Sequence, residues 1–312
     1  MNRPNSVTTT GFGASISMRE NQVLIGHDDP NAIEAQFMSI DGTGLQHIEA
    51  VLIPSRDQSA DFGTSVAIGE QTLFVGAPMD SLTPSGMEGM VHMYETDIRF
   101  TVPECDMDMM SDRIQWIEDD VPMGSEYFAN SLEVDQGFAI AGSPYEQHSF
   151  QYDGNTINAN NAGKITIFER TGLREWSPVA IFRGGHIDNP AYSSRHTDWL
   201  GESVDIEGST AVAGAQQATD EPNGYLTSGS VRVYERGGAG WALSVELFPE
   251  ENGQTPFVSV RGYGSAVDLD STATLLAVGA RSSSINGTGT GAGFVYERSG
   301  SSWIRSALLN PP

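Results

Sequence analysis

The stretch FGTSVAIGEQTLFVGAP, residues 62–78, decides the fold, both through its internal pattern and because it recurs. Small and apolar residues alternate up to a turn at Gly69-Glu70, and a second apolar run then stops at Gly76-Ala77-Pro78. A period of two is typical of β-strands rather than helices. A short turn that contains glycine joins two such strands as a hairpin. The stretch therefore predicts a two-stranded unit.

Four other stretches repeat this pattern, and they begin at Gly11, Tyr127, Trp199 and Gly262. In each one, an aromatic residue or a leucine opens the first strand and a glycine lies near the end of the second. We call the opening residues the anchors. They are separated by 50, 66, 72 and 63 residues and are Phe12, Phe62, Phe128, Leu200 and Tyr263.

Each unit continues beyond this hairpin. A glycine followed by alternating apolar residues recurs in GMVHMYE (89–95), GKITIFER (163–170), GSVRVYER (229–236) and GAGFVYER (291–298). A turn and a tryptophan then open a last apolar segment, at Trp176, Trp241 and Trp303. The first unit keeps a weaker version of these segments. The pattern predicts four strands in each unit.

Five such units predict an all-β fold, a β-propeller of about five four-stranded antiparallel blades in a single domain over residues 1–312. One blade cannot bury both of its faces, so neighbouring blades must stack. An irregular acidic segment, 96–127, leaves six blades as an alternative. Five is preferred, because this segment is short for a blade and must also supply the outer strand of the second unit. The repeats cover roughly 11–61, 62–126, 127–198, 199–261 and 262–312.

The recurring residues have packing roles in such a fold. We expect Phe62 and the other anchors to wedge between adjacent blades. Small pairs such as Gly76-Ala77, Gly142-Ser143 and Gly214-Ala215 suit strands near the propeller axis, where blades converge. The three tryptophans should cover the outer strands or hold them to the neighbouring blade.

The segments FGTSVAI, LFVGAP and GMVHMYE resemble the FG-GAP repeat family, which includes the propellers of integrin α-subunits and many bacterial surface and secreted proteins. The VYER segment followed by glycine and tryptophan is similar to the bacterial branch. The resemblance covers nearly the whole chain. It implies a propeller at the cell surface or outside the cell that takes part in interaction and adhesion, often with calcium. The ligand does not follow from the fold.

Calcium is the point at which this chain departs from the family. Integrin-like repeats often hold Ca²⁺ in an Asp-x-Asp-x-Asp-Gly loop between the first two strands. Here those turns read MRENQ, IGEQT, VDQGF, IEGST and LDSTAT, which cannot supply six or more oxygen ligands. The weak candidates Asp106, Asp108 and Asp112 lack the glycine for a sharp turn and a late bidentate glutamate. We therefore expect no cofactor, although the resemblance alone implies Ca²⁺.

Charge narrows the class of partner. The chain has 41 Asp+Glu against 16 Lys+Arg, a net charge of −25 at pH 7. Such a surface repels nucleic acid and anionic membranes, although acidic surfaces also simply maintain solubility. No apolar run approaches the roughly 20 residues of a membrane helix, and the lone Cys105 excludes an internal disulfide. The first ten residues lack the apolar core of a secretory signal. A monomer, or a module of a larger assembly, is expected.

Long connections on a rigid scaffold are where function is expected. The loops between the second and third strands lie on one face of the predicted propeller, together with the links between units. We call it the loop face. Its aromatic, histidine and acidic residues suit a glycan or a protein ligand, with ordering of the loops themselves as the alternative. The predicted binding residues are Tyr145, His148, Tyr152, Asp153, His186, Tyr192, His196, Asp220 and Tyr225.

Sequence tests for catalysis mostly fail. The chain has no Gly-x-Ser-x-Gly, His-Glu-x-x-His or Walker motif, so no catalytic residue is assigned and a non-catalytic binding or adhesion propeller is preferred. One alternative is a polysaccharide lyase or hydrolase that uses His148 or His196 as acid or base. Another is a structural module of a larger surface protein or appendage.

Overall fold

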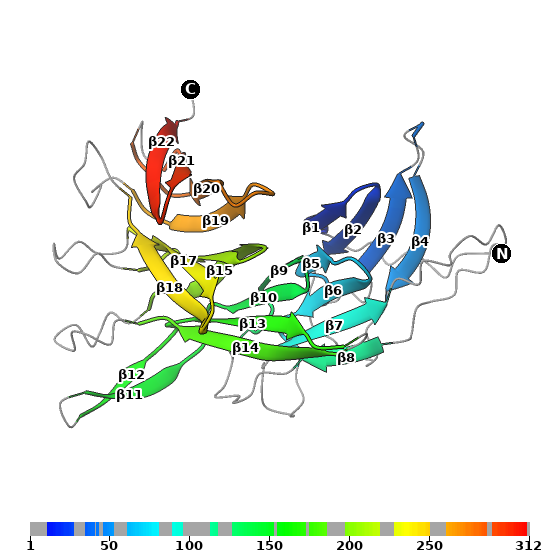
Figure 1. The fold of residues 1–312 in the computed structure, drawn as a ribbon, viewed down its shortest axis with the longest axis horizontal. Helices are drawn as coiled ribbons and strands as arrows, with labels where there is room; N and C mark the ends of the chain where they lie inside the picture. Colours follow the sequence, from blue (N-terminus) through cyan, green and yellow to red (C-terminus); the bar gives the residue numbers. More distant parts are fainter. Residues whose placement is uncertain are drawn as a thin grey trace. The chain divides into compact units, whose positions relative to one another are not determined.

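The computed structural model shows an all-β protein (Figure 1). None of the residues it describes belongs to a helix that could cross a membrane. Five four-stranded antiparallel sheets form the blades of a five-bladed β-propeller, as predicted. The described residues are 11–27, 35–40, 42–43, 46–52, 61–80, 89–95, 113–117, 127–152, 155–172, 175–185, 197–218, 228–249, 260–285 and 289–310.

The chain divides into two compact units, and we describe each by itself: residues 1–132 with 171–175, and residues 133–170 with 176–312. The first unit contains two blades. Blade 1 has the strands β1 (Phe12–Arg19), β2 (Gln22–His27), β3 (Ala35–Ile40) and β4 (Gln46–Leu52). Blade 2 has the strands β5 (Ser65–Ile68), β6 (Thr72–Ala77), β7 (Met90–Glu95) and β8 (Arg113–Ile117). Strand β8 lies in the acidic segment 96–127, as the five-blade prediction required.

The second unit contains the other three blades. Blade 3 has the strands β9 (Ser131–Asp135, which begins in the first unit), β10 (Phe138–Ser143), β13 (Lys164–Arg170) and β14 (Trp176–Arg183). Blade 4 has the strands β15 (Leu200–Glu207), β16 (Thr210–Ala215), β17 (Ser230–Gly237) and β18 (Gly240–Leu247). Blade 5 has the strands β19 (Tyr263–Leu269), β20 (Leu275–Ala280), β21 (Ala292–Ser299) and β22 (Ser302–Leu309).

One element was not predicted. The segment that connects β10 to β13 along the chain forms two strands, β11 (His148–Tyr152) and β12 (Asn155–Ala159). They pair with each other as a separate two-stranded sheet. The sequence had predicted a loop for this segment. Figure 1 shows the hairpin extending away from the sheet of blade 3.

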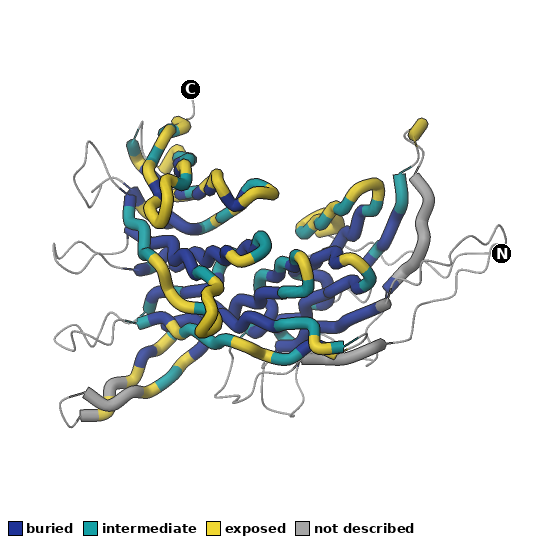
Figure 2. Tube along the Cα trace, in the orientation of Figure 1, coloured by how far each residue is buried: buried dark blue, intermediate teal, exposed yellow. Residues whose placement is uncertain are grey.

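The apolar core lies between successive blades. In the first unit, side chains from β2 and β3 form one cluster with those of β5 and β6. In the second unit, one cluster joins blades 3 and 4 and another joins blades 4 and 5, and the middle strands are the most deeply buried (Figure 2). The anchors Phe62, Phe128, Leu200 and Tyr263 are at most 1% exposed, whereas Phe12 is 50% exposed. The predicted wedge role is confirmed for Phe62, Leu200 and Tyr263, which belong to the clusters between blades.

A hydrogen bond recurs between successive blades, and it explains the serine that follows the anchor by three residues. The serine Oγ donates to the carbonyl oxygen of the residue after the next blade's anchor. The three described pairs are Ser15 to Gly63 at 2.7 Å, Ser65 to Ala129 at 2.6 Å, and Ser203 to Gly264 at 2.9 Å.

The same contact explains the glycine of the second strand. A Cβ atom on Gly26, Gly76 or Gly214 would lie 2.0, 2.4 or 1.8 Å from that accepting carbonyl oxygen. These glycines were expected to relieve crowding at the propeller axis. The structure shows that they make room for a backbone carbonyl group of the following blade.

The Glu-Arg dipeptide near the end of the third strand also joins blades in the second unit. Arg236 of blade 4 pairs with Glu169 of blade 3 at 3.0 Å, and Arg298 of blade 5 pairs with Glu235 of blade 4 at 2.8 Å. The ring of Trp241 packs edge-on against Phe138 of blade 3, with the centroids 5.6 Å apart. The prediction that these tryptophans hold an outer strand to its neighbour is confirmed for Trp241.

Replacing Ser65 with alanine should lower the free energy of unfolding by about 1–2 kcal/mol, because the buried Ala129 carbonyl would lose its donor. Urea denaturation of the whole chain measures this. Ser306→Ala is the control, since Ser306 is exposed and its hydrogen bond, 3.3 Å long, stays within one blade. It should change stability by less than about 0.5 kcal/mol. Equal losses in the two variants would contradict a special role for the inter-blade bond.

Candidate functional site

In blades 2 to 5, the loops between the second and third strands start and end at equivalent positions of the sheet. In each of four blades, the glycine at the start of the third strand donates its N–H to a carbonyl four residues beyond the glycine of the second strand. The pairs are Gly89 to Asp80 at 2.9 Å, Gly163 to Glu146 at 3.2 Å, Gly229 to Ala218 at 3.0 Å, and Gly291 to Ser283 at 3.0 Å. Loops of very different length are therefore closed at their base by the same backbone hydrogen bond. Binding loops are commonly held on a rigid scaffold in this way.

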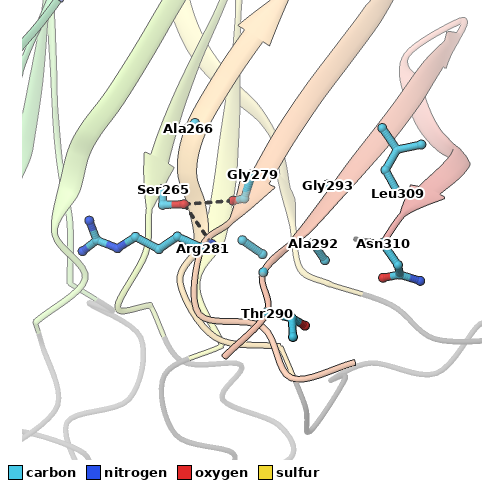
Figure 3. Close-up of a pocket in the computed structure, with 11 residues that line it drawn as sticks. Ser265, Ala266, Gly279, Arg281, Thr290, Ala292, Gly293, Leu309 and Asn310 are labelled. Atoms are coloured by element: carbon cyan, nitrogen blue, oxygen red, sulfur yellow. Dashed lines mark hydrogen bonds between the residues drawn. The ribbon is translucent and has the colours of Figure 1, made fainter. Parts of the chain in front are cut away.

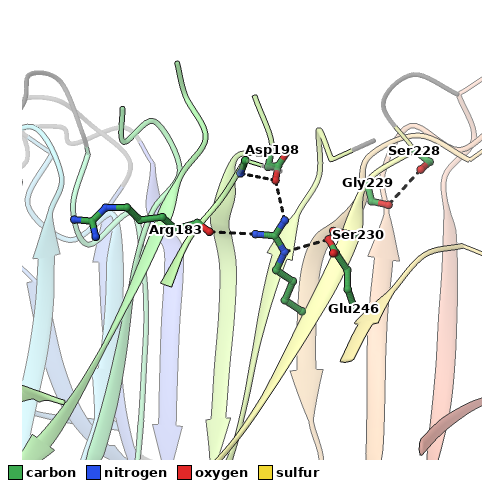
Figure 4. A network of polar contacts seen from close by, with 8 residues as sticks. Arg183, Asp198, Ser228, Gly229, Ser230 and Glu246 are labelled. Atoms are coloured by element: carbon green, nitrogen blue, oxygen red, sulfur yellow. Dashed lines mark hydrogen bonds and ion pairs between the residues drawn. The ribbon is translucent and has the colours of Figure 1, made fainter. Parts of the chain in front are cut away.

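A buried ion network lies at this base in the second unit (Figure 4). Arg232, on β17, contacts the carboxylate of Asp198 at 2.8 Å and that of Glu246, on β18, at 3.1 Å. The same Asp198 oxygen accepts the N–H of Gly185 at 2.8 Å, and Ser230 Oγ donates to Glu246 at 2.6 Å. The Asp198 side chain is fully buried and that of Arg232 is 7% exposed.

Arg232 keeps its positive charge in this network. Burial alone would lower the pKa of Arg232, but Glu246 and Asp198 more than offset that effect and raise it. Burial has the opposite effect on the neighbouring Tyr234 and raises its pKa. A guanidinium that cannot lose its proton is suited to fixing structure and not to acid–base exchange. The network therefore positions the links that lead into blade 4.

A second cluster carries groups that reach solvent. The buried carboxylate of Glu146 contacts Arg183 Nε at 2.9 Å and His148 Nδ1 at 3.1 Å. The Arg183 side chain is 38% exposed and that of His148 is 14% exposed. Glu146 thus holds an arginine from the end of β14 and a histidine from the start of β11 at the base of one loop.

An aromatic pair adjoins this cluster. Tyr145, which precedes Glu146, packs edge-on against Trp199 with ring centroids 5.2 Å apart, and both residues are half-buried. The backbone of Trp199 has φ of 55°. The residue before the anchor has positive φ in all five blades, and it is glycine in blades 1 and 5. A tryptophan there is strained, because this region favours glycine.

A similar buried pair lies in the first unit. His92 Nε2 lies 3.3 Å from Asp80, and the two side chains are 0% and 2% exposed. Phe62 packs edge-on against His92. We assign this pair to the packing of blade 2.

A pocket of about 550 Å³ lies on blade 5, lined mostly by small residues of β19–β21 and the loop before β21, together with Arg281, Leu309 and Asn310 (Figure 3). In blade 4, a Cβ on the glycine that opens the third strand, Gly229, would lie 2.1 Å from the Tyr263 carbonyl of the next blade. The equivalent atom on Gly291 would meet nothing closer than 3.5 Å. The pocket on blade 5 therefore lies at the position where, on blade 4, the anchor Tyr263 of the next blade packs. It includes none of the predicted binding residues.

Two of the predicted binding residues are described: Tyr145 packs against Trp199, and His148 is hydrogen-bonded to Glu146. The side chain of Tyr152, on β11, lies outside the described part, as do Asp153, His186, Tyr192, His196, Asp220, Tyr225 and the weak metal candidates Asp106, Asp108 and Asp112. Among described residues, no group of three histidine, cysteine or acidic side chains is arranged to hold a metal ion. These assignments stay predictions.

Sequence reasoning missed Arg183, Glu146 and Trp199 as site residues. Arg183 ends a strand and Glu146 starts a loop, so neither shows a motif. Trp199 did carry a signal, because it is a bulky side chain at a position that two other repeats give to glycine. No family model matches the chain, and no curated protein matches it.

Proposed function

We propose that this chain is an FG-GAP-type, non-catalytic propeller that binds a carbohydrate outside the cell or at its surface and takes part in adhesion. The observation that carries the proposal is the half-buried Tyr145–Trp199 pair beside Glu146, Arg183 and His148. Apolar faces of sugars pack on aromatic rings. A few fixed polar groups then orient the ligand.

The strain at Trp199 supports a role in binding. Two repeats use glycine at this position, so the backbone alone does not require a large side chain. Local strain concentrates where function needs a particular side chain. Trp199 directly precedes the buried anchor Leu200, the first residue of β15, so its backbone is tied to a rigid strand.

Arg183 supports an oriented polar contact. Its Nε is engaged by Glu146, which holds the guanidinium plane at the surface of an otherwise strongly acidic chain. A planar guanidinium can donate two parallel hydrogen bonds to a hydroxyl pair or a carboxylate. Binding without calcium is part of the proposal, because none of these groups requires a metal ion.

The test is a substitution that removes the ring and relieves the backbone. Trp199→Gly should weaken binding of the best ligand from a glycan array by about tenfold or more. It should change the free energy of unfolding by less than about 1 kcal/mol, since loss of packing and relief of strain oppose each other. Titration calorimetry measures the affinity, with and without EDTA.

Tyr127→Gly is the matched control. Tyr127 has the same backbone conformation before the anchor of blade 3, with φ of 54°, and this variant should bind like the native chain. Native affinity in Trp199→Gly, or no carbohydrate ligand at all, would overturn the proposal. Capture of a protein ligand through the same face would point to the protein-binding alternative.

One contact favours an enzyme as the second candidate. A histidine hydrogen-bonded to a buried carboxylate, as His148 is to Glu146, is a common acid–base arrangement. The enzyme would release new sugar ends from a polysaccharide, and His148→Ala would abolish that release. Binding without release favours the non-catalytic proposal.

A further inference from the structure

Six carboxyl groups lie in corresponding positions on the first strands of blades 3, 4 and 5. They follow each anchor by five and seven residues: Glu133 and Asp135 on β9, Asp205 and Glu207 on β15, and Asp268 and Asp270 on or directly after β19. Within the second unit, β15 packs against both β10 of blade 3 and β19 of blade 5 (Figure 1). The same positions of blades 1 and 2 hold Ser17, Arg19, Ala67 and Gly69.

Two of these carboxyl groups bond directly across blades, whereas Asp270 bonds within its own turn, to Thr272, Thr274 and Leu275. Asp205, which is buried, accepts the N–H of Ile206 in its own strand and that of Leu269 in blade 5. Asp135 of blade 3 accepts the N–H of Gly208 in blade 4 at 2.8 Å. In the first unit, a neutral group has the corresponding role, since Ile68 of blade 2 donates to Ser17 Oγ of blade 1 at 3.0 Å. The second unit therefore uses an ionisable carboxyl group to accept a backbone N–H from the next blade, whereas the first unit uses a serine hydroxyl.

The charged groups that face these carboxyls are other carboxyls. Glu133 faces Asp205, Glu207 and Asp268, and Glu207 faces Asp135, Asp205 and Asp270. The strands packed behind them are β10 (FAIAGS), β16 (TAVAGA) and β20 (LLAVGA), which contain no charged residue. The main electrostatic influences on Glu133, Asp205 and Glu207 come from other carboxyl groups.

We propose that the contact between blades 3, 4 and 5 around their first strands is a pH-responsive device, closed when Glu133, Asp205 and Glu207 hold protons and loosened by repulsion among the neighbouring carboxylates when they lose them. Protonated carboxyls can donate hydrogen bonds to one another, whereas adjacent carboxylates repel. Mild acidification then tightens the unit that carries the candidate binding site. The proposal does not depend on what that site binds.

The direction of the pH dependence follows from the titration of three groups. Burial raises the pKa of Glu133 from 4.5 to about 7. Burial, followed by Asp135, raises that of Glu207 from 4.5 to about 7. Burial raises that of Asp205 from 3.8 to about 6, against the effect of its backbone donors. The native state therefore binds more protons than the unfolded state between about pH 4 and pH 7, and stability falls as pH rises through this range.

The experiment compares urea midpoints of the whole chain at about pH 5 and about pH 8. The native chain should be more stable at the lower pH, with an unfolding equilibrium constant smaller by about tenfold or more. Glu133→Gln/Glu207→Gln should be more stable than the native chain at about pH 8 and should lose most of this pH dependence. Asp205→Asn, which keeps an acceptor for Leu269, is a second variant with the same expected direction.

Glu297→Gln is the control, because Glu297 is an exposed carboxylate outside the six. It should leave the pH dependence as it is in the native chain. A native chain equally stable at both pH values would overturn the proposal, as would a double variant with the native pH dependence. Stabilisation at about pH 8 by calcium chloride that the double variant loses would also overturn it, since the carboxyls would then serve a metal ion rather than protons.

Discussion

Replacing Gly214 with alanine is expected to lower the free energy of unfolding by about 3 kcal/mol or more, the upper range for overpacking a rigid interior. The added Cβ would lie 1.8 Å from the carbonyl oxygen of Gly264 and 2.5 Å from Ser203 Oγ. The carbonyl belongs to the backbone of blade 5, so relief requires two blades to separate. Thermal and urea denaturation measure the loss.

The same position in blade 5 provides the control. A Cβ on Gly279 would approach nothing closer than Ala266 Cβ at 3.2 Å, so Gly279→Ala should cost less than about 1 kcal/mol. Adding Ser203→Ala to Gly214→Ala should give no rescue, because the nearer obstacle is the carbonyl. Similar losses at Gly214 and Gly279 would show that these glycines serve the strand itself rather than the contact between blades.

The repeat made the fold predictable. Strand periodicity, turn residues and the fivefold recurrence predicted four strands per unit and five units, and the structure confirms both. Strand β8 followed from the same reasoning, because blade 2 needed an outer strand and only the acidic segment could supply it. Local pattern sufficed because each blade is built mainly from sequence neighbours.

Contacts between blades were not predictable from the pattern. Ser65 read as one small residue in an alternating strand, and nothing in the repeat showed that its Oγ bonds a carbonyl 64 residues away. Likewise, Glu169 and Arg236 occur in copies of one motif, yet each pairs with the copy in the adjacent blade. Pairing between repeats depends on the relative placement of blades, which a single repeat does not encode.

The candidate site was predictable only in part. Tyr145 and His148 were identified from the composition of a long loop, but the residues that hold them came from elsewhere: Arg183 from the end of β14 and Trp199 from the link before blade 4. The hairpin of β11 and β12 was also missed, although the Asp153-Gly154 pair within that segment is a hairpin signal. The aromatic residues of this segment favoured a binding loop as the interpretation, although its alternating pattern also fits two short strands.

Replacing Arg232 with methionine should lower the free energy of unfolding by about 3–5 kcal/mol, because removing one partner leaves a buried charge uncompensated. That charge is on Asp198, whose side chain is fully buried. Glu246 is less affected, since its side chain is 18% exposed and can turn to water. Urea denaturation near neutral pH measures the effect.

Arg232→Met/Asp198→Asn should recover most of this loss, because the amide is neutral and its oxygen still accepts the N–H of Gly185. A double-mutant cycle then gives the coupling between the two residues. A single variant that costs less than about 1 kcal/mol would contradict a structural role for the ion pair. Asp198 directly precedes Trp199, so the cycle also bears on the candidate site. If the network positions the aromatic pair, Arg232→Met should weaken ligand binding and the double variant should restore it, whereas Trp199→Gly should weaken binding without a comparable loss of stability.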